Sequence, residues 1–240
     1  MKSIQEILSQ QEFSKADLIH LLEIKNHEEM DLLRETSYET MKNYVGEEVY
    51  LRGLVEFSNI CVNDCFYCGI RKSNSSVKRY ILSKEDIIES AIWCAEKGYG
   101  SIVLQSGERS DENFVSFVED CVYEIKEKTK SDTLPNGLGI TLCIGELDYK
   151  QYERLFKAGA HRYLLRIETT NPKLFNEIHP ENQIFEKRVE CLKIIKDIGY
   201  HLGTGVMIGL PNQTTQDLAR DLFFFKEMDI DMLGMGPYIV

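Results

Sequence analysis

Three cysteines stand close together in the stretch "NICVNDCFYCGIRKSN". Cys61, Cys65 and Cys68 have the spacing C-x3-C-x2-C. A closed tetrahedral zinc site normally takes four protein ligands, so three thiolates leave one position unfilled. Three thiolates can instead hold three irons of a [4Fe-4S] cluster and leave the fourth iron free to bind another molecule. The spacing therefore indicates a cluster with an open iron. A zinc site completed by a distant residue and a set of three buried thiols are the alternatives.

Polar residues in two strand-like segments could surround such a cluster. The segment "SIVLQSGE" carries Gln105, Gly107 and Glu108 at its end, where glycine permits close backbone approach and oxygen atoms can accept from an ammonium group. The alternative is an ordinary strand-to-helix turn. In "HRYLLRIET", alternation places Arg166 and Glu168 on one face. Charges in an apolar strand require either a polar cavity or a structural ion pair.

Further candidates lie on later segments. Alternation in "LGITLCIGE" places Thr141 and Cys143 on one face, and Thr141 could present a hydroxyl to a cavity, whereas Cys143 is expected to be a small buried side chain. Arg188, in "FEKRVECL", could grip a carboxylate or lie on a solvated helix face. Met207 and Met232 could contact an adenine or pack in the core.

Glycines are dense in "GTGVMIGLPNQT", at Gly203, Gly205 and Gly209. Such density in a strand usually marks close backbone approach, which here predicts a ligand nearby. Three other cysteines fall on predicted helices without a spaced partner and are expected to be ordinary thiols: Cys94, Cys121 and Cys191.

The elements that must position these residues alternate between strand and helix after Val49. The predicted strands are residues 49–57, 101–108, 138–146, 161–169, 200–209 and 232–240. The predicted intervening helices are residues 83–98, 111–128, 147–159, 183–199 and 214–228. Alternation of this kind predicts a parallel α/β sheet. A (β/α)8 barrel has two more strands, so we expect either an open six-stranded arrangement or a barrel without its last quarter.

Residues 1–48 precede this alternation and are predicted to form a helical extension. Ser14 and Asp17 have the spacing of a capping box, and leucines such as Leu18 and Leu21 supply an apolar face. We therefore divide the chain into this extension and a barrel domain over residues 49–240.

Composition limits the classes of function. Lys+Arg 28 against Asp+Glu 39 gives a net charge of -11, which argues against general nucleic-acid binding. The N-terminus is too polar for a secretory signal and no apolar run is long enough for a membrane span, so a cytoplasmic protein is expected. In a reducing compartment the seven cysteines favour metal binding or catalysis over disulfides.

The cysteine spacing after a first strand, with Tyr67 before the last cysteine, resembles the radical S-adenosylmethionine (SAM) superfamily. Several stretches resemble its [FeFe]-hydrogenase maturase branch, HydE, a relative of biotin synthase and methylornithine synthase. These stretches are "EFSNICVNDCFYCGIRKSN", "IVLQSGE", "AGAHRYLLRIETTNP", "GVMIGLPNQT" and "IDMLGMGPYI".

This resemblance implies a TIM-like radical SAM barrel of which six of eight βα units are present. It implies that a [4Fe-4S] cluster on the three cysteines reductively cleaves SAM to a 5′-deoxyadenosyl radical, in maturation of the hydrogenase cluster. Implied SAM contacts are Tyr67, Gln105, Gly107, Glu108, Glu168, Arg188 and Met232, whereas Thr141 and Arg166 are implied to line the substrate cavity. Implied partners are a small iron-containing precursor or another small substrate, an electron donor such as a ferredoxin or flavodoxin, and other maturases, without nucleic acid or membrane.

Two departures from the HydE pattern affect the interpretation. Ile167 stands where the branch usually has histidine, and Val240 follows closely on "GPYI", where members continue through two more βα units. The second departure predicts a truncated barrel whose activity is open. The alternatives are a biotin-synthase-like or methylornithine-synthase-like enzyme acting on a carbon substrate, or a barrel fragment that binds metal without catalysis.

Overall fold

The computed structural model describes residues 2–239, so Met1 and Val240, the last residue of the predicted sixth strand, lie outside the description. The helices are α1 (Ile4–Leu8), α2 (Lys15–Leu22), α3 (His27–Val45), α4 (Lys84–Glu96), α5 (Glu112–Lys128), α6 (Tyr149–Ala158), α7 (Pro172–Ile178), α8 (Phe185–Ile198) and α9 (Thr215–Glu227). The strands are β1 (Gly53–Ser58), β2 (Ser101–Ser106), β3 (Gly139–Cys143), β4 (Arg162–Leu164), β5 (His201–Thr204), β6 (Met207–Ile208), β7 (Met232–Leu233) and β8 (Gly236–Pro237).

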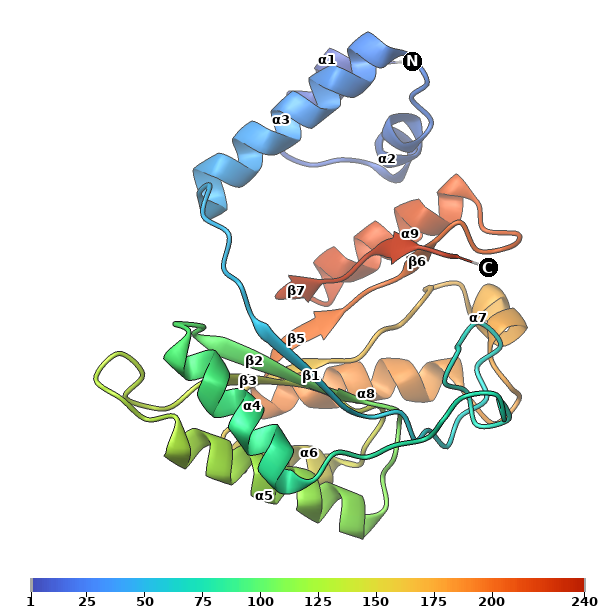
Figure 1. The fold of residues 1–240 in the computed structure, drawn as a ribbon. Helices are drawn as coiled ribbons and strands as arrows, with labels where there is room; N and C mark the ends of the chain where they lie inside the picture. The colour runs from blue at the N-terminus through green and yellow to red at the C-terminus, as the bar shows by residue number, and fades with distance from the viewer. Residues whose placement is uncertain (1, 240) are drawn as a thin grey trace.

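A six-stranded parallel sheet forms the centre of the molecule, in the order β1-β2-β3-β4-β5-β7. Helices α4, α5, α6 and α8 follow one another across its outer face (Figure 1). Neighbouring strands are consecutive along the sheet, so each crossover helix covers the strands that it joins. The predicted α/β alternation is confirmed, and the sheet is a partial TIM-like barrel.

Local sequence signals set the helix boundaries of this layer. Ser83 caps α4 with a capping box to Asp86, and Asp148 caps α6 in the same way with Gln151. Gly159 ends α6 in the left-handed conformation, where glycine meets no Cβ penalty. The predicted boundaries of both helices therefore follow from their caps.

The hydrophobic core lies between the sheet and these helices. Alternate residues of β2 and β3 are fully buried there: Ile102, Leu104, Ile140 and Leu142. Side chains alternate across a strand, so the intervening residues of the same strands face the opposite, concave side. This division separates a packed face from a face that is available to a site.

The later strands differ from the prediction. Predicted strand four (161–169) is regular only over β4, and Glu168, near the end of the predicted segment, adopts a positive φ of 64°. Predicted strand five divides into β5 and β6, and predicted strand six into β7 and β8, with β8 pairing with β6. Strand one begins at Gly53, four residues later than predicted. Helix α7 was not predicted, although Asn171 caps it and Pro172 occupies its first turn.

The N-terminal helices stand apart from the sheet and meet it through α9. The Oγ1 of Thr215 donates to Glu23 at 2.7 Å, and Lys226 pairs with Glu12 at 3.1 Å. An extended segment after α3 leads to β1, and α2 lies beside α9 (Figure 1). The predicted helical character of this region is confirmed, and the capping box of Ser14 and Asp17 is present. Its separation as a part distinct from residues 49–240 stays a prediction.

Candidate functional site

The three cysteines lie in the loop that joins β1 to α4. Two backbone hydrogen bonds hold the start of this loop against the end of β2: Gly107 N–H donates to the Ser58 carbonyl at 3.1 Å, and Val62 N–H donates to the Glu108 carbonyl at 3.0 Å. A Cβ at position 107 would collide with the Ile60 carbonyl, so glycine is required there. The backbone that closely approaches Gly107 is that of the cysteine loop, and the predicted contact of Gly107 with SAM stays a prediction.

Arg79 closes the same loop from its other end. Its guanidinium donates to the carbonyls of Asn59 at 2.7 Å, Ile70 at 2.8 Å, Arg71 at 2.6 Å and Asn74 at 3.1 Å. These carbonyls flank the cysteine segment on both sides, so one side chain fixes the turn that presents all three thiols. No spacing pattern marks Arg79 in the sequence, because its partners are backbone atoms.

The three thiols are partly buried and unbridged. Burial raises the pKa of Cys65 to about 12, against the opposing effects of Tyr67 and Arg188, and burial also raises the pKa of Cys68. These two side chains are therefore neutral thiols until a metal displaces their protons. Within residues 2–239, no three histidine, cysteine or acidic side chains converge on a point that could hold one metal ion. A [4Fe-4S] cluster binds each thiolate through a different iron, so this donor set fits a cluster.

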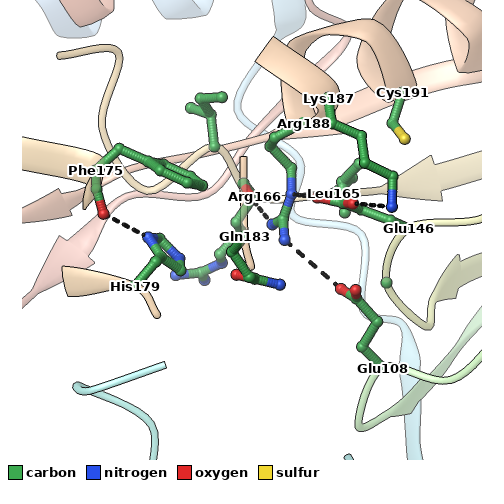
Figure 2. A network of polar contacts seen from close by, with 12 residues as sticks. Glu108, Glu146, Leu165, Arg166, Phe175, His179, Gln183, Lys187, Arg188 and Cys191 are labelled. Atoms are coloured by element: carbon green, nitrogen blue, oxygen red, sulfur yellow. Dashed lines mark hydrogen bonds and ion pairs between the residues drawn. The ribbon is translucent and has the colours of Figure 1, made fainter. Parts of the chain in front are cut away.

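Arg188 lies at the centre of a buried polar network beside this loop (Figure 2). Its Nε donates to Glu146 Oε1 at 2.5 Å, its Nη1 donates to the Arg166 carbonyl at 2.8 Å, and its Nη2 lies 3.6 Å from Glu108 Oε2. Lys187 pairs with the other oxygen of Glu146 at 3.2 Å. Arg188 is only 6% exposed, so the alternative of a solvated helix face is wrong.

The charges in this network depend on one another. Burial opposes the charge of Arg188, but Glu146 and Glu108 raise its pKa, so the guanidinium stays ionised. Burial raises the pKa of Glu108, and Arg188 partly opposes that shift. A buried charge without its partner is strongly destabilising, so the three side chains form one unit. Glu146 was missed in the sequence, although "CIGE" repeats the Gly-Glu ending of "QSGE".

Glu168 and Thr141 each have a buried oxygen without a partner among the described residues: Glu168 Oε2 and Thr141 Oγ1. Burial raises the pKa of Glu168 to about 7, while Arg166 and Arg188 favour its ionised form. Arg166 itself is exposed. Buried polar atoms are normally satisfied, so the orphaned oxygens of Glu168 and Thr141 are positions at which a bound ligand can supply the missing partner.

Tyr67 is held by the segment that follows α7. Its hydroxyl lies 3.2 Å from His179 Nε2, and the two rings meet edge to face. Burial lowers the pKa of His179 to about 4, so the ring is neutral near pH 7. Nδ1 lies 2.9 Å from the Phe175 carbonyl, which can only accept. Nδ1 therefore carries the proton, and Nε2 accepts from the hydroxyl of Tyr67.

Gln105 and Met232 contact other parts of the chain. Gln105 Nε2 donates to Glu56 Oε1 at 3.3 Å across the pair β1–β2. The sulfur of Met232 accepts from Arg52, which precedes β1, at 3.4 Å. These contacts test neither residue as a SAM ligand, so both assignments stay predictions.

The glycines of β5 and the following segment approach the protein's own strands. A Cβ at position 205 would collide with the Gly234 carbonyl, and one at position 203 would press on Leu164 and Met232. The close approach expected from their density is therefore real, but the approaching groups at Gly203 and Gly205 belong to neighbouring strands. Gly209 is required for a different reason, a positive φ of 89°.

Comparison with models of known protein families identifies the family of this chain. The sequence model of the radical SAM superfamily matches residues 55–225, a span that contains the three cysteines and the Arg188 network. The chain belongs to the radical SAM superfamily. Members of this superfamily use a [4Fe-4S] cluster and S-adenosylmethionine. The radical SAM assignment agrees with the position of the cysteine loop at the carboxyl end of the first strand of a partial barrel.

Among curated relatives, the [FeFe] hydrogenase maturase subunit HydE of Thermotoga maritima is 41% identical over 99% of this radical SAM chain and 66% of its own length. Biotin synthase of Staphylococcus haemolyticus is 28% identical over 97% of this chain and 70% of its own length. The crystal structure of methylornithine synthase superposes with a TM-score of 0.84 at 23% identity, covering 99% of this chain and 68% of that one.

The chain spans about two thirds of the length of the curated relatives that it matches. Among the helices described between residues 2 and 239, none combines the length and hydropathy needed to cross a bilayer.

Proposed function

We propose that this chain acts in maturation of the [FeFe]-hydrogenase cluster as a HydE-like radical SAM enzyme. The observation that supports this proposal is the 41% identity to HydE along 99% of the chain. Biotin synthase reaches only 28% over a similar span, which makes the biotin-synthase-like alternative the weaker candidate.

The residues proposed to hold the cofactors are those at the mouth of the barrel. Cys61, Cys65 and Cys68 would bind the [4Fe-4S] cluster through their sulfur atoms. When bound, the cluster and SAM supply reductive cleavage of the sulfonium and hence a 5′-deoxyadenosyl radical. The protein orients these groups and excludes water from them.

The proposed SAM contacts are Tyr67, Gln105, Gly107, Glu108, Glu168, Arg188 and Met232. The network described above sharpens two of these roles. Nε of Arg188 donates to Glu146 and one N–H of Nη1 donates to a backbone carbonyl, so the second N–H of Nη1 and the Nη2 group, which lies toward Glu108, remain for the carboxylate of SAM. Glu168 supplies an unpaired buried oxygen, which can accept from a hydroxyl or an ammonium group.

Thr141 and Arg166 are proposed to contact the substrate deeper in the cavity. Thr141 Oγ1 is buried and lacks a partner within residues 2–239, and the Arg166 side chain is exposed. The guanidinium of Arg166 and the hydroxyl of Thr141 suit a small anionic or metal-bound substrate.

The HydE-like role leads us to propose three kinds of partner: a small iron-containing precursor, other maturases and an electron donor such as a ferredoxin or flavodoxin. A reducing compartment, such as the cytoplasm, preserves the thiols that such a cluster needs.

Cluster binding is tested first, by anaerobic reconstitution with iron and sulfide. We expect about four irons per chain and release of 5′-deoxyadenosine when dithionite and SAM are added. Cys65→Ala should lose the cluster, whereas Cys94→Ala, a buried thiol on α4, should retain it. Equal iron loss in both variants would contradict the ligand assignment. Iron without SAM cleavage would favour the non-catalytic alternative.

The hydrogenase role is tested by adding the reconstituted chain to a cell-free maturation mixture that lacks its HydE component. Recovery of hydrogenase activity supports the proposal, and the Cys65→Ala variant is the negative control. Turnover of dethiobiotin without recovery of hydrogenase activity would favour the biotin-synthase-like alternative.

A further inference from the structure

The last residue of α7 and the segment that follows it, residues 178–183, contact the cysteine loop at three points. Phe66 N–H donates to the Ile178 carbonyl at 3.0 Å, and the hydroxyl of Tyr67 donates to His179. The third contact joins the side chains of Cys65 and Gln183, whose Sγ and Oε1 lie 3.4 Å apart. None of these contacts was predicted, because 118 residues separate Cys65 from Gln183.

Gln183 is buried at this contact, and a hydrogen bond fixes its backbone. It is only 7% exposed, and its own N–H donates to the Pro180 carbonyl at 2.9 Å, which closes a turn just before α8. Figure 2 draws Gln183 together with the residues of the Arg188 network. A glutamine held in this way keeps its amide group against the sulfur of Cys65.

The direction of the hydrogen bond must change when Cys65 binds iron. In the metal-free chain the thiol donates to Oε1. A thiolate has no proton to donate, so an acceptor oxygen facing it would be repelled. Turning the amide by half a rotation exchanges Oε1 for the NH2 group, which has two donors. The same side chain then donates to the thiolate without any movement of the backbone.

The polar contact of Cys61, another of the three cysteines of the loop, is made by the backbone. Cys61 Sγ accepts from the backbone N–H of Asn63 at 3.4 Å, a bond that no side-chain substitution removes. Burial raises the pKa of the Cys65 thiol and the hydroxyl of Tyr67 acts to lower it, but the hydrogen bond of that hydroxyl runs to His179 Nε2. Among the described residues, the hydrogen bond that the Cys65 thiol donates is to Gln183, a side chain that can be replaced.

We infer that Gln183 is a positioning residue that donates a hydrogen bond to the cluster-bound sulfur of Cys65 and raises the reduction potential of the cluster. Hydrogen bonds to cluster sulfurs are among the features that set the potential. A donor stabilises the extra negative charge that the sulfurs carry after one-electron reduction, so it favours the reduced state. This inference rests on the proposed cluster site at Cys61, Cys65 and Cys68.

The test compares the midpoint potential of the reconstituted cluster, measured by EPR-monitored redox titration, in the wild type and two variants. Gln183→Leu removes both amide atoms, and Gln183→Glu keeps the shape but replaces the donor by a carboxylate. Both should shift the potential negatively, by about tenfold in the one-electron equilibrium constant, or ~59 mV. Asn176→Leu, an exposed change on α7, should leave the potential unchanged.

A second readout is the hyperfine coupling of exchangeable protons in the reduced cluster, compared in water and heavy water. One coupling present in the wild type should be absent from Gln183→Leu. Full iron content with an unchanged potential in both variants would overturn the inference alone. A wild-type chain that binds no cluster would overturn the proposed cluster site and this inference with it.

Discussion

The two faces of the parallel sheet differ in whether their buried polar groups have hydrogen-bond partners. On the outer face, Leu142 and Tyr163 are completely buried against helices, and the Tyr163 hydroxyl donates to the Gly145 carbonyl at 2.7 Å. On the concave side, Thr141 is buried as deeply, yet its hydroxyl has no partner within the part of the chain that is described. Glu168, at the mouth of the barrel, likewise has a buried carboxylate oxygen without a partner among the described residues. At these positions the polar group of the outer face has a partner within the chain, whereas Thr141 and Glu168 each leave an oxygen that a further group can satisfy.

The largest effect is expected on the outer face. Leu142→Ala should lower the free energy of unfolding by about 2–5 kcal/mol, because it leaves a cavity in close-packed surroundings. Urea unfolding of the metal-free chain measures this loss. Cys143→Ala, the next residue on the concave face, is the matched control and should cost less than half as much. Equal losses would show that the two faces are packed alike.

Glu168→Gln should raise the free energy of unfolding, unlike Leu142→Ala, and it should do so only at higher pH. The pKa of Glu168 is raised from 4.5 to about 7, chiefly by burial, so the folded chain binds this proton more tightly than the unfolded chain. The resulting stability is fully present below pH 4.5 and is lost as the pH rises through 7. Glutamine removes this dependence, so the variant should exceed the wild type by up to about 3 kcal/mol at pH 8.

The measurement is urea unfolding of the metal-free chain at several pH values between about 4.5 and 8. The control is the same substitution at Glu153, whose carboxylate is exposed and pairs with Lys157 at 3.0 Å. A stability difference between Glu168→Gln and wild type that does not grow with pH would contradict the assignment of a buried, unpaired carboxyl.

The smallest effect is expected from a comparison of two buried threonines. Thr141→Val should stabilise the metal-free chain by about 1 kcal/mol, because it removes an unsatisfied hydroxyl and keeps the side-chain shape. Thr204→Val should destabilise it by about the same amount, since Thr204 Oγ1 donates to the Leu165 carbonyl at 2.8 Å and accepts from Ile167 N–H at 3.1 Å. Thermal melts of both variants provide the measurement. A loss of stability in both would mean that Thr141 has a partner.

Features encoded over a few residues could be predicted from the sequence. The spacing of Cys61, Cys65 and Cys68 indicated a cluster ligand set, and it rests on one loop. The cap at Ser83 and the alternation of strands and helices predicted the order of elements, because caps and periodicity depend on neighbours within a turn or two. The strand ends were less predictable. β4 ends at Leu164 and Glu168 adopts a positive φ of 64°, although the strand pattern continues from residue 161 to residue 169.

Partnerships between distant segments were decided only by the tertiary structure. From the sequence, Arg188 could bind a carboxylate or lie on a solvated helix face, and only the tertiary structure placed it against Glu146, 42 residues away. Gln183 carried no signal, because its partner lies on a loop that the chain had left 118 residues earlier. The sequence by itself determined which chemistry the cysteine loop can hold. The packing of α7 and α8 against that loop decided which side chains surround it, because burial and pairing of charges depend on which segments meet in space.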